Sequence, residues 1–280
     1  MKLIRIGEPG RERPAAIDGS GALRDLSAHI TDIDASALSD AGLAALRRLD
    51  LGAQPLVPAG SRIGPCVADV GKFICIGLNY ADHAAEAGMA LPDEPAVFLK
   101  ATSAIGGPDD DVVLPRNSTR GDWEIELGFV IGTKASYVAE AGALAYVAGY
   151  FTANDVSERE LQLDRGGQWT KGKSCDTFGP IGPWLVTADE VPDPQKLELH
   201  LAVNGQTMQS GSTANMVFGV AKLVSYLSHF MTLFPGDIVS TGTPAGVGLG
   251  RKPPVYLKPG DRMTARVEGL GEQNQRVVGG

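Results

Sequence analysis

The chain has 280 residues, of which 43% are hydrophobic and 21% charged, and its formal net charge is −8. These proportions are ordinary for a folded protein, and an acidic chain without a basic stripe is not expected to bind nucleic acid. No stretch approaches about 20 consecutive apolar residues and the N-terminus lacks a signal-peptide pattern, so we expect a cytoplasmic protein that does not enter a membrane.

The first 68 residues are expected to form a small N-terminal domain, followed by a main domain over residues 69–280. Leu3–Ile6 and Leu23–Leu26 have the pattern of strands and lie on either side of a turn at residues 18–21. A helix is predicted next from leucines at helical spacing, namely Leu38, Leu43, Leu46 and Leu49. Prolines and a glycine at 55–60 then mark a linker.

The main domain begins with an apolar segment at 72–76, which predicts a short buried strand. The segment from Asn79 to Glu86 follows a glycine and predicts a turn that opens a helix, on which His83 and Glu86 would be neighbours. A carboxylate that holds one imidazole nitrogen orients the ring and raises its basicity, as a general base that activates water requires. The alternative is an ordinary surface pair.

The segment at 122–127 alternates acidic and apolar residues, which is the period of a strand. Its apolar residues would share one face and its acids, Asp122, Glu124 and Glu126, the other. Two unit charges about 4 Å apart repel by roughly 4 kcal/mol at an effective dielectric near 20. A row of acids therefore faces either open water, as on an exposed edge strand, or a cation that takes an oxygen from Glu124 and Glu126.

A third acid follows the next apolar strand, predicted over 147–153. Asp155 comes directly after that strand and before a predicted helix that starts at Val156, so it is either the N-cap of the helix or a third oxygen ligand. Three carboxylates without histidine or cysteine nearby indicate magnesium, manganese or calcium rather than zinc. Magnesium is favoured because it leaves coordination positions to water.

The rest of the chain mixes short strands with few helices. The clearest helical pattern spans residues 217–233, and Asn204-Gly205 predicts a tight hairpin turn between two strands. The glycine-rich segment at 241–248 matches neither a Walker A nor a Rossmann motif, because no helix with the required Gly-Lys-Ser or Gly-x-Gly-x-x-Gly pattern follows.

From residue 72 onward the chain resembles the fumarylacetoacetate hydrolase superfamily. The resemblance rests on six motifs in family order: Gly77-Leu78-Asn79-Tyr80-Ala81-Asp82-His83, Asp122-Trp123-Glu124-Ile125-Glu126-Leu127, Asn154-Asp155-Val156-Ser157-Glu158-Arg159, Lys171-Gly172-Lys173-Ser174-Cys175-Asp176-Thr177-Phe178-Gly179-Pro180, Phe234-Pro235-Gly236-Asp237 and Thr241-Gly242-Thr243-Pro244-Ala245-Gly246-Val247-Gly248. It implies an α+β fold, in which a mixed β-roll catalytic domain carries a small N-terminal α/β domain, and a homodimer.

The resemblance also implies roles for individual residues. In the family, two glutamates of the acidic strand and the aspartate after the next strand bind Mg²⁺ or Mn²⁺, which correspond here to Glu124, Glu126 and Asp155. The other implied roles are a His83–Glu86 dyad, a lysine at Lys173, polar substrate contacts at Arg159 and Gln168, and a carboxylate-binding loop with the Thr243 hydroxyl.

The implied activity is metal-dependent hydrolysis of a C–C bond in a β-diketo acid, which releases pyruvate or a related acid. The N-terminal sequence and the segment from Gly77 to Glu86 most resemble members that act on acylpyruvates of the 2,4-diketo-3-deoxy sugar acid type. Oxaloacetate decarboxylase, hydroxy-dienoate isomerase and ureidoglycolate lyase are alternatives with the same metal site, and a non-catalytic metal-binding module is a remote one. Specificity is expected to come from loops around Met89, Arg116–Ser118 and Arg165–Gly167.

Overall fold

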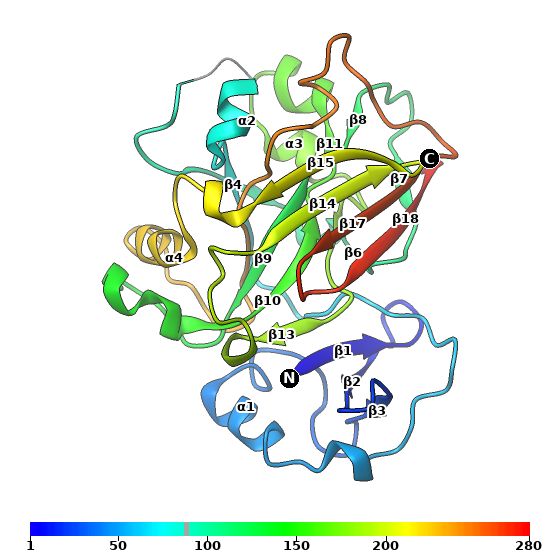
Figure 1. Ribbon diagram of the computed structural model, residues 1–280, viewed down its shortest axis with the longest axis vertical. Helices are drawn as coiled ribbons and strands as arrows, with labels where there is room; N and C mark the ends of the chain where they lie inside the picture. Colours follow the sequence, from blue (N-terminus) through cyan, green and yellow to red (C-terminus); the bar gives the residue numbers. More distant parts are fainter. Residues whose placement is uncertain (87–89) are drawn as a thin grey trace.

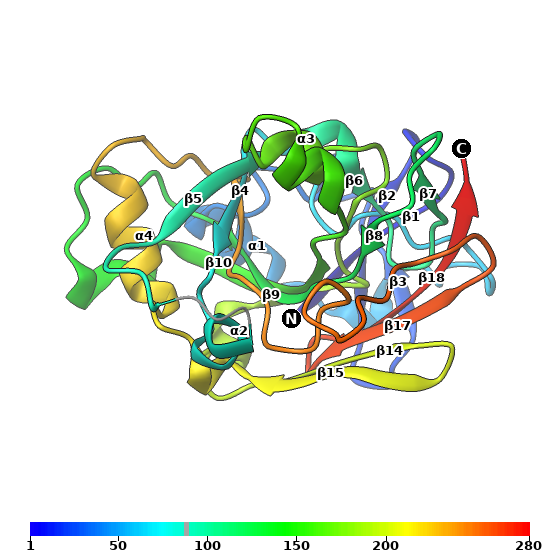
Figure 2. The same cartoon turned by 90° about the horizontal axis from the view of Figure 1, so that it is seen from above.

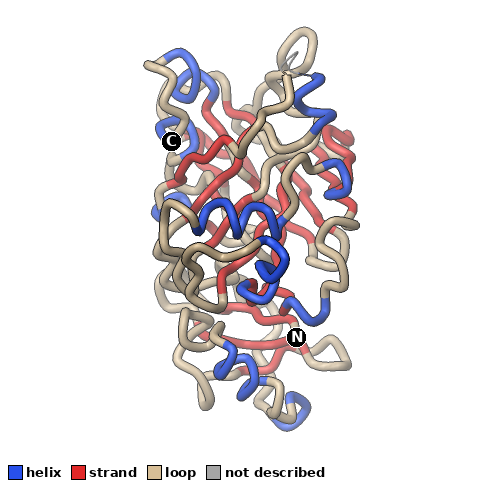
Figure 3. Tube along the Cα trace, turned by 90° about the vertical axis from the view of Figure 1, so that its left-hand side faces the viewer, coloured by secondary structure: helices blue, strands red, loops and turns tan. Residues whose placement is uncertain are grey.

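The computed structural model describes residues 1–86 and 90–280, so that Met89 lies outside the described residues. The molecule is elongated, with the N-terminal elements at one end and short helices at the other (Figures 1 and 3). Strands form its body, in one nine-stranded sheet, one five-stranded sheet and two two-stranded pairs. This arrangement confirms the predicted α+β class with a mixed β-roll.

The nine-stranded sheet runs through the whole length of the molecule. Its central strands β9 and β10 are buried at every residue, as expected for strands covered on both faces. Among the described strands of this sheet, β16 and β4 are the one pair that runs in parallel. In spatial order the sheet contains β3 (Leu23–Asp25), β2 (Arg13–Ile17), β1 (Lys2–Ile6), β13 (Leu185–Thr187), β10 (Val147–Asn154), β9 (Ile125–Ile131), β16 (Ile238–Ser240), β4 (Phe73–Gly77) and β5 (Ala96–Lys100).

The five-stranded sheet lies across β9 and β10, and the main core fills the space between the two sheets. Its strands are β15 (Gln206–Ser212), β14 (Glu198–Val203), β17 (Arg262–Val267), β18 (Glu272–Gly279) and β7 (Val112–Leu114). Alternate residues of β17 and β18 are buried, as one solvated and one core-facing side require. The two-stranded pairs are β8 (Gly121–Asp122) with β11 (Ser157–Glu158) and β6 (Ile105–Gly106) with β12 (Gly179–Pro180).

The helices are short and lie outside the sheets. They are α1 (Asp40–Leu46), α2 (Ala81–Glu86), α3 (Thr170–Lys173) and α4 (Val220–Ser228), with a π-helical turn η4 (Glu160–Asp164) and a 3₁₀ segment η3 (Glu140–Tyr146). Helix α4 packs on η3 and falls within the predicted range 217–233. No helix among the described residues combines the length and the apolar character needed to cross a membrane.

The N-terminal segment continues the large sheet, because β1 pairs with β13. Its apolar residues, such as Leu3 and Leu43, share a core cluster with Phe73 and Phe151 of the main part. The domain limit at residue 68 stays a prediction. The turn at 18–21 connects β2 to β3 rather than the two strands that we expected, since the strand Arg13–Ile17 lies between them. Pro14 in that strand conceals it in the sequence.

Two local predictions in the main part are wrong. The acidic segment is not one strand, because Trp123 and Glu124 interrupt it between β8 and β9. No helix begins at Val156; the chain forms β11 first, and η4 starts only at Glu160. Glu158 accepts a hydrogen bond from the Leu161 amide at 2.7 Å and so caps that turn instead of Asp155. The hairpin at Asn204-Gly205 is confirmed, with φ of 51° and 77°.

Candidate active site and metal centre

The three predicted metal ligands lie together at one end of β9 and β10. These strands are antiparallel, with Ala153 opposite Glu126, and the Asp155 amide donates to the Glu124 carbonyl at 2.9 Å. Strand pairing therefore brings all three carboxylates close together. One oxygen from each lies within 4.8 Å of the others, and all three residues are buried. The acids of the alternating segment thus point into the protein and not to an exposed edge.

Three cationic side chains surround this acid cluster. The Lys173 ammonium lies 2.7 Å from Glu124 Oε2 and 2.7 Å from Asp155 Oδ2. Arg159 pairs with Glu124 Oε1 at 2.7 Å and with Asp122 Oδ2 at 2.7 Å. The Lys100 ammonium is 2.7 Å from Asp155 Oδ1. A buried row of acids is tolerated here because each of Glu124, Asp155 and Asp122 has a cation in contact.

Lys100 holds Asp155 by charge and not by a hydrogen bond. Its ammonium donates to the carbonyl oxygens of Val156, Phe178 and Lys173, which takes all three of its protons. Among the described residues, Asp155 Oδ1 consequently has no hydrogen-bond donor, and its negative charge is balanced by the Lys100 ammonium.

The two glutamates have opposite electrostatic environments. Burial raises the pKa of a carboxyl group, but for Glu124 the charges of Lys173 and Arg159 outweigh burial and hold the pKa at about 2. The pKa of Glu126 is raised well above its ordinary value, because burial and the negative charges of Asp155 and Glu124 act together. Among the residues that the structure describes, the Ser240 hydroxyl and the Gly242 amide are the hydrogen-bond donors to the Glu126 carboxyl group, at 2.8 Å for the latter.

These residues fit a hard divalent cation. All the candidate ligands are carboxylate oxygens, the donors that Mg²⁺ and Mn²⁺ prefer. Asp155 Oδ1 lacks a donor, and Glu126 has no ion-pair partner among the described residues. A cation bound by Glu124, Glu126 and Asp155 would relieve the repulsion that raises the pKa of Glu126.

The two residues of the predicted dyad are neighbours on α2. His83 Nδ1 lies 3.5 Å from Glu86 Oε2, and Glu86 in turn accepts from the Gly246 amide at 3.0 Å. The turn before α2 is fixed by Asn79, whose amide group donates to the carbonyls of Phe218 and Thr241 at 3.0 and 2.8 Å. The loop after β16 therefore contacts both the turn that precedes the dyad and the dyad itself.

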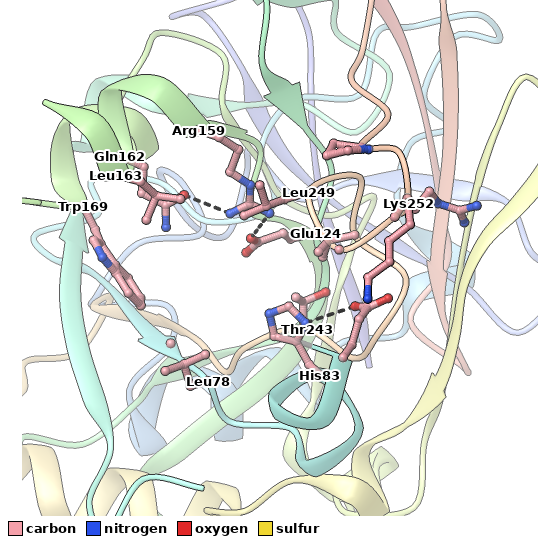
Figure 4. A pocket seen from close by; sticks show the side chains of 16 residues that line it. Leu78, His83, Glu124, Arg159, Gln162, Leu163, Trp169, Thr243, Leu249 and Lys252 are labelled. Atoms are coloured by element: carbon pink, nitrogen blue, oxygen red, sulfur yellow. Dashed lines mark hydrogen bonds and ion pairs between the residues drawn. The ribbon is translucent and has the colours of Figure 1, made fainter. Parts of the chain in front are cut away.

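One cavity of about 530 Å³ joins the dyad to the acid cluster. Of the predicted site residues, it is lined by His83, Glu86, Glu124, Arg159 and Thr243. Figure 4 shows Glu124 and Arg159 facing His83 and Thr243 across the cavity. Its lining residues come in part from α2, the start of α3 and the orange segment near residue 250, which lie at the end of the molecule away from the N-terminal elements (Figure 1; seen from above in Figure 2).

Two predicted substrate contacts differ from expectation in their surroundings. The Thr243 hydroxyl already donates to the Ile125 carbonyl at 2.8 Å and accepts from Gln209 at 2.7 Å, so its proton is not free for a substrate carboxylate. Gln168 is exposed, accepts from the Thr170 amide at 3.1 Å at the start of α3, and is not part of the cavity wall. Gln162, paired with Arg159 at 2.9 Å, lines the cavity instead.

Sequence reasoning missed several residues of this site. Gln162 lies three residues after Arg159, a spacing that places both on one helical face. Lys100 is a charged residue at the end of an apolar strand, which is a weak signal. The sequence indicates Asp122 only as part of the acidic row, whereas in the structure it also accepts from the amides of Gly248 and Leu249 at 2.7 and 3.0 Å. No sequence pattern indicates Trp169, which lines the cavity.

Known proteins with this architecture are similar over the full chain. A relative from Burkholderia cenocepacia (strain HI2424), whose name gives only the general class hydrolase, is 61% identical over 99% of both chains. The solved fumarylacetoacetate hydrolase of Exiguobacterium antarcticum is 35% identical with a TM-score of 0.86, covering 100% of each chain. Maleylpyruvate hydrolase from Sphingobium sp. SYK-6 is 31% identical with a TM-score of 0.83, again covering 100% of each chain.

The family model described as fumarylacetoacetate (FAA) hydrolase C-terminal matches residues 72–278, which include all the site residues described above. With this match and the full-length relatives, the chain belongs to the fumarylacetoacetate hydrolase family.

Proposed function

We propose that this enzyme hydrolyses a C–C bond in an acylpyruvate or a 2,4-diketo-3-deoxy sugar acid and releases pyruvate or a related acid. The observation that carries the proposal is that one cavity contains both the His83–Glu86 dyad and Glu124 of the acid cluster. Hydrolysis requires a base that activates water, in addition to a group that stabilises charge on the substrate. The two solved relatives described above are named as hydrolases of fumarylacetoacetate and of maleylpyruvate, which supports a hydrolytic reaction.

Glu124, Glu126 and Asp155 would hold Mg²⁺ or Mn²⁺. Such a cation supplies Lewis-acid polarisation and a template for an oxo acid. His83, oriented by Glu86, takes a proton from water as the water oxygen bonds to the distal carbonyl carbon of the substrate. The C–C bond then breaks, its electron pair remains on the pyruvate part as an enolate, and a proton converts the enolate to pyruvate.

Lys173 is suited to share the negative charge of that enolate. Burial lowers the pKa of an ammonium group, but the charges of Asp155 and Glu124 outweigh burial and raise the pKa of Lys173. The group therefore stays protonated in the range in which enzymes work. It is buried among the acids and donates to Glu124 and Asp155, so its position is fixed before substrate binds.

A second candidate is isomerisation of a hydroxy-dienoate. The solved 2-hydroxyhepta-2,4-diene-1,7-dioate isomerase from Mycobacterium marinum is 34% identical over the full chain with a TM-score of 0.79. Isomerisation, like oxaloacetate decarboxylation, needs the charge-stabilising site but no activated water. The dyad is therefore the feature that distinguishes hydrolysis from both reactions.

The test is to compare the wild-type protein with His83→Ala on an acylpyruvate, a 2,4-diketo-3-deoxy sugar acid, a hydroxy-dienoate and oxaloacetate, each with Mg²⁺. We expect the variant to lose at least about 100-fold in kcat on the diketo acid, since general-base catalysis is worth about 10²–10⁴-fold. Decarboxylation of oxaloacetate should persist. An equal loss of kcat on the diketo acid and on oxaloacetate would contradict the proposal. The absence of diketo-acid hydrolysis by the wild type would also contradict it.

We also propose that the protein is a homodimer. Three exposed aromatic residues lie close to the end of α4, namely Tyr137, Phe230 and Phe234, which are 77%, 55% and 49% exposed. Tyr137 stacks on His229 with ring centroids 5.9 Å apart, which ties it to this end of the helix. These exposed aromatic side chains are our candidates for the subunit interface. Light scattering on the purified protein gives the mass directly, and a monomer at micromolar concentration would refute the dimer.

A further inference from the structure

One side of the cavity is apolar although it adjoins a charged site. Figure 4 shows Leu78, Leu163 and Trp169 together along this side, across from His83 and Thr243. Leu163 remains 41% exposed, so its burial contributes little to the fold. Val247 and Leu249 add further apolar lining. An exposed apolar surface continuous with a catalytic site is the feature that an apolar part of a substrate would cover.

Trp169 is held rigidly in this wall. Its ring packs edge-on against Phe98 at a centroid distance of 5.4 Å, and it lies so close to Gly77 that a Cβ there would stand 2.3 Å from Trp169 Cζ3. The next residue, Leu78, has a φ of 54°, which is an uncommon conformation for a bulky side chain. Strain and close packing at the same point indicate that the wall is preorganised for a ligand.

The same wall has few polar groups for substrate hydroxyls. Arg159 uses its guanidinium on Asp122, Glu124 and Gln162. The side-chain oxygen of Gln162 accepts from Arg159. The side-chain nitrogen of Gln162 is therefore the donor that remains beside the three apolar residues. A hydroxylated chain placed here would lose water from several hydroxyl groups that each need a partner, and such loss is costly.

We propose that Leu78, Leu163 and Trp169 form the acyl subsite, and that the substrate is an acylpyruvate whose acyl group is an apolar chain of several carbons. This inference rests on the proposed hydrolysis of a β-diketo acid. It selects the apolar acylpyruvates over the polyhydroxylated 2,4-diketo-3-deoxy sugar acids. The cavity volume of about 530 Å³ leaves room for a chain beyond the diketo acid itself.

The test measures kcat/KM of the Mg²⁺-loaded protein for acetyl-, butanoyl- and hexanoylpyruvate and for one polyhydroxylated 2,4-diketo-3-deoxy acid. Burial of each added methylene should raise kcat/KM about fourfold. Leu163→Ser should lower kcat/KM for hexanoylpyruvate about tenfold more than for acetylpyruvate. Leu144→Ser is the matched control, because Leu144 is 43% exposed and lies outside the cavity wall, and it should leave the chain-length dependence unchanged.

The outcomes separate this inference from the proposed function. Hydrolysis of acetylpyruvate without any rise along the series, or a preference for the polyhydroxylated acid, would overturn the acyl subsite and leave the hydrolase proposal in place. An equal effect of Leu163→Ser and Leu144→Ser would also overturn it. If none of the diketo acids is cleaved, both proposals fail together.

Discussion

At the scale of single residues, Glu126 has a different environment from the other acids of the cluster. Glu124 and Asp155 each contact a lysine, whereas the polar partners of Glu126 in the described part of the chain are a hydroxyl and an amide. The fold therefore keeps one carboxyl group whose charged form is unfavourable, and its pKa is raised. A folded-state pKa above the unfolded value contributes stability at low pH, and that stability is lost as the pH rises through the folded-state pKa.

Glu126→Gln should therefore stabilise the metal-free protein at neutral pH. An uncharged amide can still accept from Ser240 and Gly242 but no longer repels Asp155 and Glu124. We expect Tm to rise by about 2 °C or more in the presence of a chelator, and the stabilisation by added Mg²⁺ to disappear. Thermal unfolding with and without Mg²⁺ measures both effects. A variant that is still stabilised by Mg²⁺ as the wild type is would exclude Glu126 as a ligand.

Asp122 connects the acid cluster to the loop after β16. It is fully buried, pairs with Arg159 and accepts from the amides of Gly248 and Leu249. Asp122→Ala would leave a buried guanidinium with one carboxylate fewer. Since breaking a buried ion pair costs about 3–5 kcal/mol, we expect the free energy of unfolding to fall by about 3 kcal/mol or more. Urea unfolding tests this, and a loss below about 1 kcal/mol would show that the pair contributes little.

At the scale of elements, local patterns predicted β4, α2, β10, α4 and the hairpin at Asn204-Gly205. They failed where tertiary contacts decide the structure. The acidic segment breaks at Trp123–Glu124, where Glu124 turns toward Lys173 and Arg159, neither of which is a neighbour in sequence. The buried cluster of Glu124, Glu126 and Asp155 could be predicted, because carboxylates in alternation have a recognisable chemistry; their role as metal ligands stays a prediction. Lys100 and Trp169 could not, since only the fold brings them to the site.

The loop after β16 is the element that holds the dyad. Gly246 has a φ of 107°, and its amide donates to Glu86. A Cβ at this position would stand 2.1 Å from the Met208 carbonyl oxygen, so Gly246→Ala must displace the loop. We expect kcat/KM on the diketo substrate to fall at least about tenfold, while the Mg²⁺ concentration that gives half-maximal stabilisation changes less than about threefold.

Gly142→Ala is the control for this prediction, because a Cβ at Gly142 would meet nothing within 4 Å. This variant should leave the activity unchanged. A Gly246→Ala protein that loses Mg²⁺ binding in parallel with activity would show that the loop supports the acid cluster and not the dyad alone.

At the scale of the whole molecule, the N-terminal segment and the main part are joined through one sheet and one core cluster. Strand β1 covers the edge of β13, and residues from both parts fill the cluster around Phe73 and Phe151. The site itself lies at the opposite end of the molecule from this junction (Figure 1). We therefore expect the N-terminal segment to act on stability and not on chemistry.

Removal of residues 1–68 should consequently prevent stable folding of the remainder. The fragment 69–280 would expose the edge of β13 and the apolar side chains that now contact Leu3 and Leu43. We expect it to be insoluble, or to lack a cooperative unfolding transition by near-UV circular dichroism. A soluble fragment that unfolds cooperatively would instead establish that residues 69–280 are an independent domain.

The central claim is that the acid cluster and the dyad act together in one metal-dependent hydrolysis. The most direct measurement is a Mg²⁺ titration of the metal-stripped protein with butanoylpyruvate, in which pyruvate and butanoate are both quantified. We predict no turnover without the metal and, with it, the two acids in equal amounts, at rates that saturate over the same Mg²⁺ range as thermal stabilisation. Turnover that is independent of Mg²⁺, or release of pyruvate without butanoate, would contradict the account.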